Sequence, residues 1–329
     1  MRLPPSSAAR GVVVLFLSLL IAAFLEAEGL RKQAQIQPAG VQRDVALDVT
    51  RPLVSVSRAL HLTTPRHDLQ VAIGRGDEDT IDTQVHLSLP PPVKTPPPKV
   101  KPKPQPVVHL PVFTARKPLR VWVAGDSLAQ IPGEALERVG GAVDVVGVES
   151  RLSTGLTRPD LYNWFTRIQK APKQLRPNVA VLSFGADDAH SYMTGVPKGK
   201  TVGPLGSRTW DAEYQRRADG VTRELIAKGI YVVWLGLPIP DGPGFARTFP
   251  VVNGILSDVV DEHPGHAAYV DDWDLLADSH GRYTAYKRVN GKLTLMRLPD
   301  GVHYTAAAGD LIAKQILKQL GTVYDVHGT

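Results

Sequence analysis

The amino-acid sequence predicts an α/β fold, a three-layer α/β/α arrangement with a doubly wound, mainly parallel sheet over residues 118–324. Short, continuous apolar runs rich in β-branched residues alternate along this segment with stretches of helical periodicity. Strands that are apolar throughout are typical of a parallel sheet that helices cover on both faces. A segment of this length is also large enough to bury its own core.

The order of the elements follows from these runs. Apolar runs predict strands at residues 119–125, 142–150, 178–186, 230–238 and from residue 267. Helices are predicted at residues 131–141, 161–172, 210–229, 249–265 and 305–321. Asn290-Gly291, inside residues 282–299, predicts a hairpin with a tight turn. The acidic run at 271–274 is predicted to be a solvated strand end. Ligands of such sheets bind where the carboxyl ends of the strands meet.

The N-terminus predicts export. Arg2 and Arg10 precede the uncharged, apolar run Gly11–Leu25, and positive charge before such a run keeps the N-terminus in the cytoplasm. We favour an uncleaved, single-pass membrane anchor within residues 1–28 that contacts the lipid bilayer through residues 11–27, with the main domain extracellular. A cleaved signal segment, with Ala27-Glu28-Gly29 as the cleavage site, would instead give a secreted protein.

Two segments separate this anchor from the predicted α/β domain. Residues 29–89 form a membrane-proximal segment in which valines and leucines recur at helical spacing, interrupted by Pro52. Residues 90–117 form a Pro/Lys-rich linker, with nine prolines and four lysines between Pro90 and Pro106. Extended polyproline chain of that length spans about 50 Å. We predict a stiff spacer.

Composition excludes several classes of function. The net charge is +6, but residues 90–106 alone supply four of these charges, so no basic face for nucleic acid is indicated. The chain has no cysteine, which excludes disulfides, thiolate metal sites and a cysteine nucleophile. No Gly-x-Gly-x-x-Gly follows a strand, which leaves a dinucleotide site unsupported. We predict no cofactor.

Polar residues that carry chemistry stand at three predicted loops. Gly125-Asp126-Ser127-Leu128 ends the first strand, and Gly185-Ala186-Asp187-Asp188 ends the third. Asp300 and His303 precede the last helix. A histidine can take the proton of a serine at a strand-to-helix turn, and a carboxylate can orient the imidazole. Taken singly, each motif is better explained as a helix cap or a surface turn.

Together these motifs resemble the SGNH (GDSL) hydrolase family of esterases and acyl transferases, which has a flavodoxin-like fold. The resemblance implies Ser127 as nucleophile, Asp300 and His303 as its triad partners, and the amides of Ser127 and Gly155 as oxyanion donors. The anchor, the stalk and this domain look like bacterial envelope proteins associated with O-acylation of surface glycans. The resemblance therefore implies ester groups, above all O-acetyl groups, of an acylated carbohydrate or cell-wall polymer as substrate, and a membrane-bound O-acyltransferase as a partner.

Asp187 departs from the family pattern, in which an asparagine at this position donates the third oxyanion hydrogen bond. An ionised carboxylate has no proton to donate and repels an oxyanion. Three alternatives follow: Asp187 is protonated, the oxyanion hole uses two backbone donors, or the protein is a non-catalytic glycan-binding or scaffold protein that retains the SGNH shell.

Two further sites were weighed on residue type. Asp187, Asp188 and His190 could ligate a metal ion, but neighbouring residues at a strand end point to alternate sides, so no metal is predicted. Residues 194–201 end like a phosphate-binding loop, but Thr194 stands where the motif requires glycine. A basic loop at the rim of the site is the interpretation that we favour.

Overall fold

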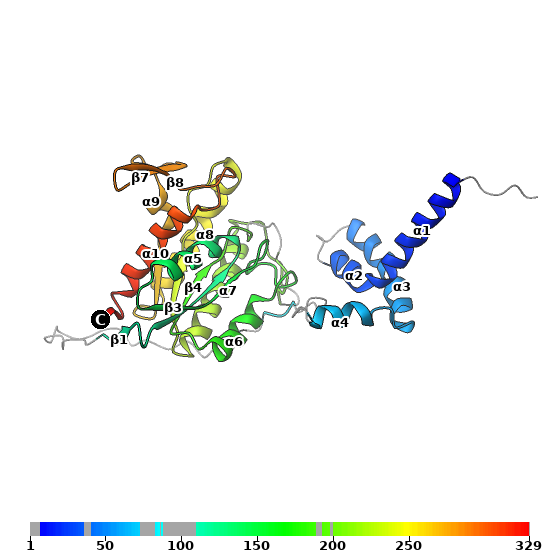
Figure 1. Ribbon diagram of the computed structural model, residues 1–329, viewed down its shortest axis with the longest axis horizontal. Coiled ribbons are helices and arrows are strands. Elements are labelled where there is room, and N and C mark those ends of the chain that lie inside the picture. Colours follow the sequence, from blue (N-terminus) through cyan, green and yellow to red (C-terminus); the bar gives the residue numbers. More distant parts are fainter. Residues whose placement is uncertain are drawn as a thin grey trace, which may run out of the picture. The chain divides into compact units, whose positions relative to one another are not determined.

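The computed structural model describes residues 7–35, 41–72, 83–85, 87, 110–188, 193–197 and 200–328. The chain divides into two compact units, Met1–Asp82 and Thr83–Thr329 (Figure 1). The Pro-rich run at 90–106 and His190 lie outside the described residues.

The N-terminal unit is helical. Its helices are α1 (Ser7–Leu25), α2 (Ala27–Gln35), α3 (Val41–Ala59) and α4 (Thr64–Ala72). Pro52 argued for a break or a helix start, but α3 continues through this proline. Ion pairs between Arg58 and Glu28 and between Arg66 and Glu26, both with N–O distances of 2.6 Å, join the helices. The large apolar side chains between Val12 and Ile21 on α1 are exposed.

Helix α1 contains the apolar run that was predicted to cross the membrane. Within the described residues, no single helix is long and apolar enough to cross a bilayer. The pair Ala9–Leu25 and Ala27–Gln35, bent by 72°, passes the same test of length and composition.

The second unit contains the predicted sheet. Its five strands are all parallel and lie in the order β3-β2-β4-β5-β6. In chain order this is 2-1-3-4-5, the flavodoxin-like variant of a doubly wound sheet, so the predicted fold class is confirmed. Strands β4 and β5 are buried along their whole length, as their continuous apolar runs predict. The strands are β2 (Leu119–Gly125), β3 (Val143–Ser150), β4 (Val179–Ser183), β5 (Tyr231–Leu235) and β6 (Ala267–Val270).

Helices form the two outer layers (Figure 1). Helix α5 packs against α10, whereas α7 packs against both α6 and α8. The chain reverses its winding direction after β3, and right-handed crossovers then put α5 and α6 on opposite faces of the sheet. The main helices are α5 (Gln130–Val139), α6 (Trp164–Leu175), α7 (Arg208–Ile226), α8 (Pro243–Asp261) and α10 (Ala306–Leu320).

Two short strand pairs lie outside the main sheet. The predicted hairpin is present as β7 (Tyr286–Val289) and β8 (Lys292–Leu295), and its turn residues Asn290 and Gly291 have φ values of 50° and 80°. A second pair joins β1 (Val112–Thr114) to β9 (Asp325–Gly328). Sequence analysis did not predict this second pair, because each strand is only three or four residues long.

A short segment before the Pro-rich run also belongs to the second unit. The carbonyl of Gln84 accepts a hydrogen bond of 3.0 Å from Asn163 Nδ2 at the start of α6. Val85 and Leu87 pack against the core, and Leu87 lies against Gly220 of α7. The compact unit therefore begins at Thr83, well before the predicted start at residue 118.

The acidic run at 271–274 is a solvated strand end only in part. It directly follows β6, and Asp271 and Asp274 are exposed, as predicted. Asp271 caps the short helix α9 (Asp272–Leu276), and its side chain accepts hydrogen bonds from the amides of Trp273 and Asp274. Asp272 is fully buried, and for this residue the prediction was wrong, because its partner Tyr304 comes from a distant part of the chain.

Candidate active site

The turn after β2 places Ser127 at the carboxyl end of the central strand. Ser127 begins a single turn of 3-10 helix, η1 (Ser127–Ala129), which leads directly into α5. A Cβ atom at Gly125 would lie 1.8 Å from the carbonyl oxygen of Ser183 on β4, so only glycine fits where the two backbones pass. Ser127 is half-buried at this turn.

Ser127, His303 and Asp300 form one hydrogen-bonded chain. His303 Nε2 lies 2.7 Å from Ser127 Oγ, and His303 Nδ1 lies 2.8 Å from Asp300 Oδ2. The other carboxylate oxygen, Oδ1, accepts hydrogen bonds from the amides of Val302 and His303 at 2.8 and 2.9 Å. The structure thus brings together three side chains from the two ends of the α/β domain. The arrangement allows the histidine to take the serine proton while the carboxylate fixes its tautomer.

The environment of Asp300 favours its ionised form. Partial burial acts to raise the pKa of this carboxyl, but the hydrogen bonds from the His303 and Val302 amides and from the His303 ring outweigh it, and the pKa lies below its ordinary value. An ionised Asp300 can accept the Nδ1 proton and stabilise the imidazolium that forms when His303 takes a proton.

Hydrogen bonds and close packing connect the loop that carries Asp300 and His303 to the loop after β5. Gly301 has a φ of 71°, and a Cβ atom there would lie 2.2 Å from the Cβ of Asp241. The amide of Asp241 donates to the carbonyl of Gly301 at 3.0 Å. Arg297, which is 1% exposed, donates from Nη2 to the carbonyls of Ile239 and Gly301. These contacts fix the position of the histidine loop.

A buried polar cluster lies under the same loop. Tyr304, next to the histidine, donates from its hydroxyl to Asp272 Oδ2 at 3.0 Å, and the Arg297 guanidinium lies 5.3 Å from the Tyr304 ring centroid. Burial raises the pKa of Asp272 to about 8, although the Tyr304 hydrogen bond and the Arg297 charge act to lower it. Asp272 is therefore mostly protonated at neutral pH.

Asp126 links the nucleophile turn to the turn after β4. Its Oδ1 accepts from the amide of Leu128 at 3.0 Å, and its Oδ2 accepts from the amides of Gly185 and Ala186 at 3.1 and 3.0 Å. Burial, and next the charge of Asp187, raises the pKa of Asp126 well above its ordinary value. Sequence analysis treated this aspartate only as a helix cap. The sequence did hold a signal for this contact. Gly125-Asp126 and Gly185-Ala186 end neighbouring strands, so a carboxylate in the first turn can reach the amides of the second.

The predicted oxyanion residues occupy different environments. Gly155 is buried, and it lies against the carboxylate of Asp188, which is fully buried itself. Asp187 is half-buried, beside Asp126 in the turn after β4. Of the two neighbouring carboxylates, Asp188 therefore points into the protein interior. No group of three His, Cys, Asp or Glu side chains suited to a metal ion occurs among the residues that the structure describes.

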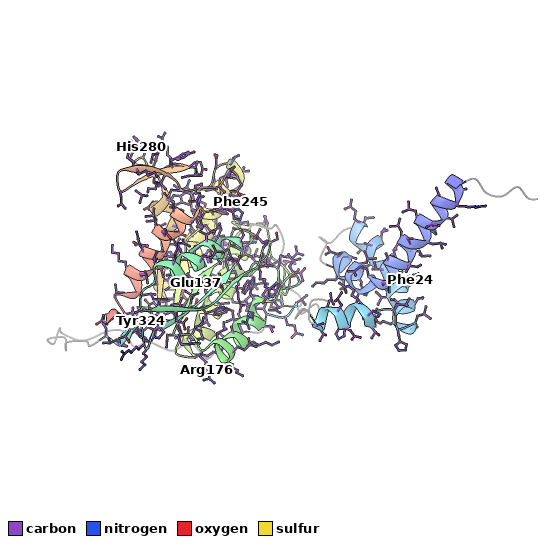
Figure 2. All side chains as sticks on the ribbon, viewed as in Figure 1. Phe24, Glu137, Arg176, Phe245, His280 and Tyr324 are labelled. Carbon is purple, nitrogen blue, oxygen red and sulfur yellow. The ribbon has the colours of Figure 1, made fainter. Side chains whose placement is uncertain are left out.

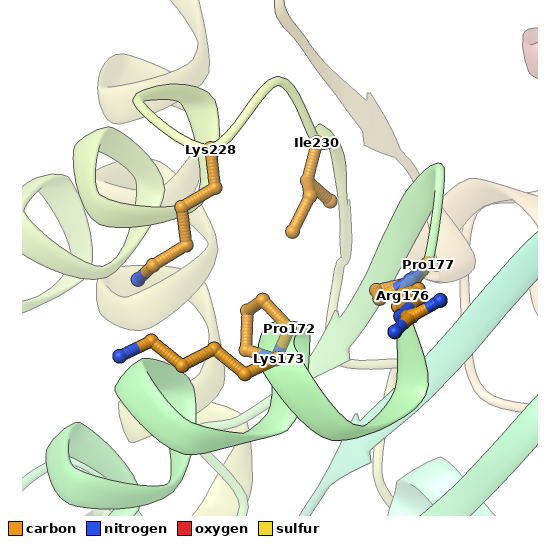
Figure 3. Close-up of a pocket in the computed structure, with 6 residues that line it drawn as sticks. All are labelled: Pro172, Lys173, Arg176, Pro177, Lys228 and Ile230. Carbon is orange, nitrogen blue, oxygen red and sulfur yellow. The ribbon is translucent and has the colours of Figure 1, made fainter.

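A shallow pocket lies away from this site (Figure 3). It opens where α6 and α7 end and β4 and β5 begin, so it faces the amino ends of the strands. Figure 2 accordingly places Arg176 at the opposite end of this unit from Phe245 and His280. The basic side chains of this pocket lie at the C-terminal ends of α6 and α7. They complement the partial negative charge of these helix ends, so an anion-binding site is not indicated. The pocket is lined by Pro172, Lys173, Arg176, Pro177, Lys228 and Ile230.

The doubly wound sheet, with a serine after its first strand and an Asp-x-x-His pair before its last helix, has the architecture of SGNH-type hydrolases. Residues 120–319 match the family described as "Protein of unknown function (DUF459)", and the chain belongs to that family. No curated protein matches the sequence.

Solved structures of low identity also resemble the chain. One is a carbohydrate esterase family 3 protein from Talaromyces cellulolyticus, with 14% identity and a TM-score of 0.38 over 62% of this chain and 97% of that chain. Another is the aryl esterase of M. smegmatis, with 12% identity and a TM-score of 0.42 over 62% and 99%. A GDSL-like lipase from Bacteroides thetaiotaomicron has 13% identity and a TM-score of 0.42 over 65% and 92%.

Proposed function

We propose that this protein is an exported serine esterase or acyl transferase that acts on ester groups of a cell-envelope carbohydrate. The observation that carries the proposal is the hydrogen-bonded chain from Ser127 through His303 to Asp300, with distances of 2.7 and 2.8 Å. O-Acetyl groups are the first esters to test. An acylated glycan or cell-wall polymer is the proposed substrate, and a membrane-bound O-acyltransferase is a proposed partner.

The geometry supports a two-step acyl transfer. His303 Nε2 takes the proton of Ser127 Oγ as this oxygen attacks the carbonyl carbon of the ester. The carbonyl π electrons move onto its oxygen to give a tetrahedral intermediate. When this intermediate collapses, the carbonyl re-forms, the bond between the acyl carbon and the sugar oxygen breaks, and His303 gives its proton to that oxygen, which leaves as the sugar hydroxyl. Water, or the hydroxyl of a second sugar, then attacks the acyl-serine with the same assistance. Hydrolysis and transfer differ only in this second acceptor.

The oxyanion needs donors in addition to the triad. The amides of Ser127 and Gly155 are the proposed donors, because both residues lie in turns at the carboxyl end of the sheet. Asp187 serves as a third donor only when it is protonated. Loss of one donor from such a site lowers the rate by about 10²–10³. The site with two backbone donors is therefore expected to be active but slow.

One observation favours a second candidate function. A carboxylate stands where the related enzymes have an amide, and a charge of this sign opposes an oxyanion. A glycan-binding or scaffold protein that retains the hydrolase shell would tolerate Asp187 without loss of function. This candidate predicts binding of an acylated glycan without turnover.

The proposed location is the cell membrane, with the N-terminus cytoplasmic and the second unit extracellular. Support comes from the exposed apolar side chains of α1 and from Arg2 and Arg10, which precede its apolar run. Residues 11–27 would then contact the lipid bilayer. Cleavage of the same segment would instead release a secreted protein.

A fluorophosphonate probe tests the nucleophile directly. The full-length protein should form one adduct at Ser127 and should hydrolyse a chromogenic acetyl ester with a burst of one equivalent. Ser127→Ala and His303→Ala should abolish both signals, whereas Ser279→Ala, which removes an exposed serine, should leave them unchanged. Undiminished hydrolysis by Ser127→Ala would contradict the triad. A folded wild type that binds acetylated glycan but neither reacts with the probe nor turns over would establish the binding protein.

A further inference from the structure

Asp188 is a fully buried carboxylate with three hydrogen-bond donors around it. Its Oδ1 accepts from the amide and from the hydroxyl of Thr157, both at 2.8 Å. Its Oδ2 accepts from the hydroxyl of Tyr214 on α7, also at 2.8 Å. The negative charge therefore has three proton donors in an interior that excludes water. None of the proposed chemical steps uses this residue.

The segment that Asp188 holds is the one that contains Gly155. Two of the three hydrogen bonds go to Thr157, two residues after the proposed oxyanion donor. The carboxylate also fills the space beside Gly155, because a Cβ atom built there would lie 2.1 Å from Asp188 Oδ1. No Cβ fits against that oxygen, so glycine is required here by the carboxylate.

Arg217 of α7 holds the same segment from its carbonyl side. The guanidinium is fully buried, and its Nη1 donates to the carbonyls of Leu156 and Thr157 at 2.7 and 3.3 Å. Nη2 donates to the carbonyl of Thr194 at 2.7 Å, and Nε pairs with Glu213 at 2.7 Å. The amide and hydroxyl groups of the segment thus bind an anion, and its carbonyls bind a cation.

A role in stability alone does not account for this arrangement. Burial of a carboxylate costs several kcal/mol even when it is well bonded, and apolar residues of the same volume often serve stability as well or better. The bonds converge on one short segment, and they fix both the amide and the carbonyl of Thr157. Rates of acyl transfer depend on donor placement, and a displacement of about 1 Å can cost about 10²-fold.

We propose that Asp188 is a positioning residue for the oxyanion hole, which holds the Gly155–Thr157 segment so that the Gly155 amide faces the reacting carbonyl. The inference rests on the proposed function. The proposal gives the two neighbouring carboxylates different roles. Asp188 orients a backbone donor, and Asp187 occupies the position of a side-chain donor.

Asp188→Asn is the first test. It keeps the size of the side chain but removes the charge and one acceptor oxygen. In the full-length protein we expect kcat for the chromogenic acetyl ester to fall by about 10–10²-fold with KM within about threefold of the wild type, because the donor matters most in the transition state. Asp219→Asn, which alters a partly buried aspartate that pairs with Arg223 and His263, is the control and should leave both constants unchanged.

A coupling experiment separates positioning from stability. Gly155→Ala should lower kcat strongly, because the new methyl group collides with Asp188. In an Asp188→Ala background this collision is absent, so the same Gly155→Ala change should cost at least tenfold less. Tryptophan fluorescence verifies that each variant is folded. If Asp188→Ala is not folded, Thr157→Val is the milder variant, because it removes only the hydrogen bond from the Thr157 hydroxyl to Asp188.

Each outcome decides the proposal. A fall in kcat with non-additive coupling supports it. A folded Asp188→Asn or Thr157→Val variant with wild-type kcat overturns it and leaves the triad intact. A fall in kcat with strictly additive Gly155 and Asp188 effects also overturns it. A wild type without turnover and without fluorophosphonate labelling removes the proposed function, and with it this role of Asp188.

Discussion

The buried carboxyl of Asp272 makes the stability of the second unit depend on pH. In the unfolded chain this group titrates near 3.8, and in the folded protein burial raises its pKa to about 8. Between these two values the folded state holds a proton that the unfolded state has released. The stability that comes from this proton is complete below the unfolded value and is lost as the pH rises toward the folded value.

Asp272→Asn removes that dependence. The amide is neutral at every pH and can still accept the hydrogen bond from Tyr304. One pKa unit corresponds to about 1.4 kcal/mol, so the stability of the variant relative to the wild type should increase by about 2.7 kcal/mol between pH 5 and pH 7. At pH 7 and above, the variant should be the more stable protein.

Urea unfolding followed by tryptophan fluorescence measures this difference. The five tryptophans lie between Trp122 and Trp273, so the signal reports the second unit even in the full-length chain. Midpoints should shift without a change in slope, which identifies a change in stability. Asp274→Asn, at an exposed carboxyl of the same helix, is the control and should keep the pH dependence of the wild type. A difference between Asp272→Asn and wild type that stays constant from pH 5 to pH 7 would show that Asp272 is ionised in the fold and refute the reasoning.

Three further predictions concern the site and the location. Asp187→Asn should raise kcat/KM by up to about 10²–10³ at neutral pH by supplying an amide donor, and a fall in kcat/KM would show that the carboxylate has another task. Gly301→Ala should lower kcat at least tenfold and slow fluorophosphonate labelling, because φ is 71° and the methyl group meets Asp241; labelling at the wild-type rate would show that the histidine loop tolerates the change. Protease added to spheroplasts should cut between residues 73 and 82 and release the second unit, whereas a protected full-length chain in the cytosol would contradict export.

Sequence patterns predicted the elements of the α/β domain because those patterns are local. Continuous apolar runs identified β4 and β5, and the Asn290-Gly291 pair identified the hairpin, since both signals depend on near neighbours in the chain. The short strands β1 and β9 have too few residues to show a period. They form because residues more than two hundred positions apart meet.

The candidate site could be predicted only in part for the same reason. Ser127, Asp300 and His303 stand in short motifs that resemble a known family, and catalysis by them stays a prediction. Asp126 and Asp188 act across the fold, on amides 59 and 31 positions away in the chain. A single sequence does not show which amides meet a buried carboxylate. Asp272 was misread for this reason, since its partner Tyr304 is 32 positions away.

The contacts that residues 83–87 make with the second unit bear on the predicted role of the proline-rich stretch as a spacer between the two units. Both described flanks of that stretch, Leu87 and Leu110, belong to the second unit, so the stretch connects two parts of one unit and does not join the two units. The covalent joint between the units is instead residues 73–82, whose chain reaches about 40 Å at most. For the proposed membrane-anchored enzyme, so short a joint would keep the second unit at an effective concentration in the millimolar range relative to substrates near the anchor. A soluble fragment for assays should begin at Thr83, because one that begins at residue 107 loses contacts of the folded unit.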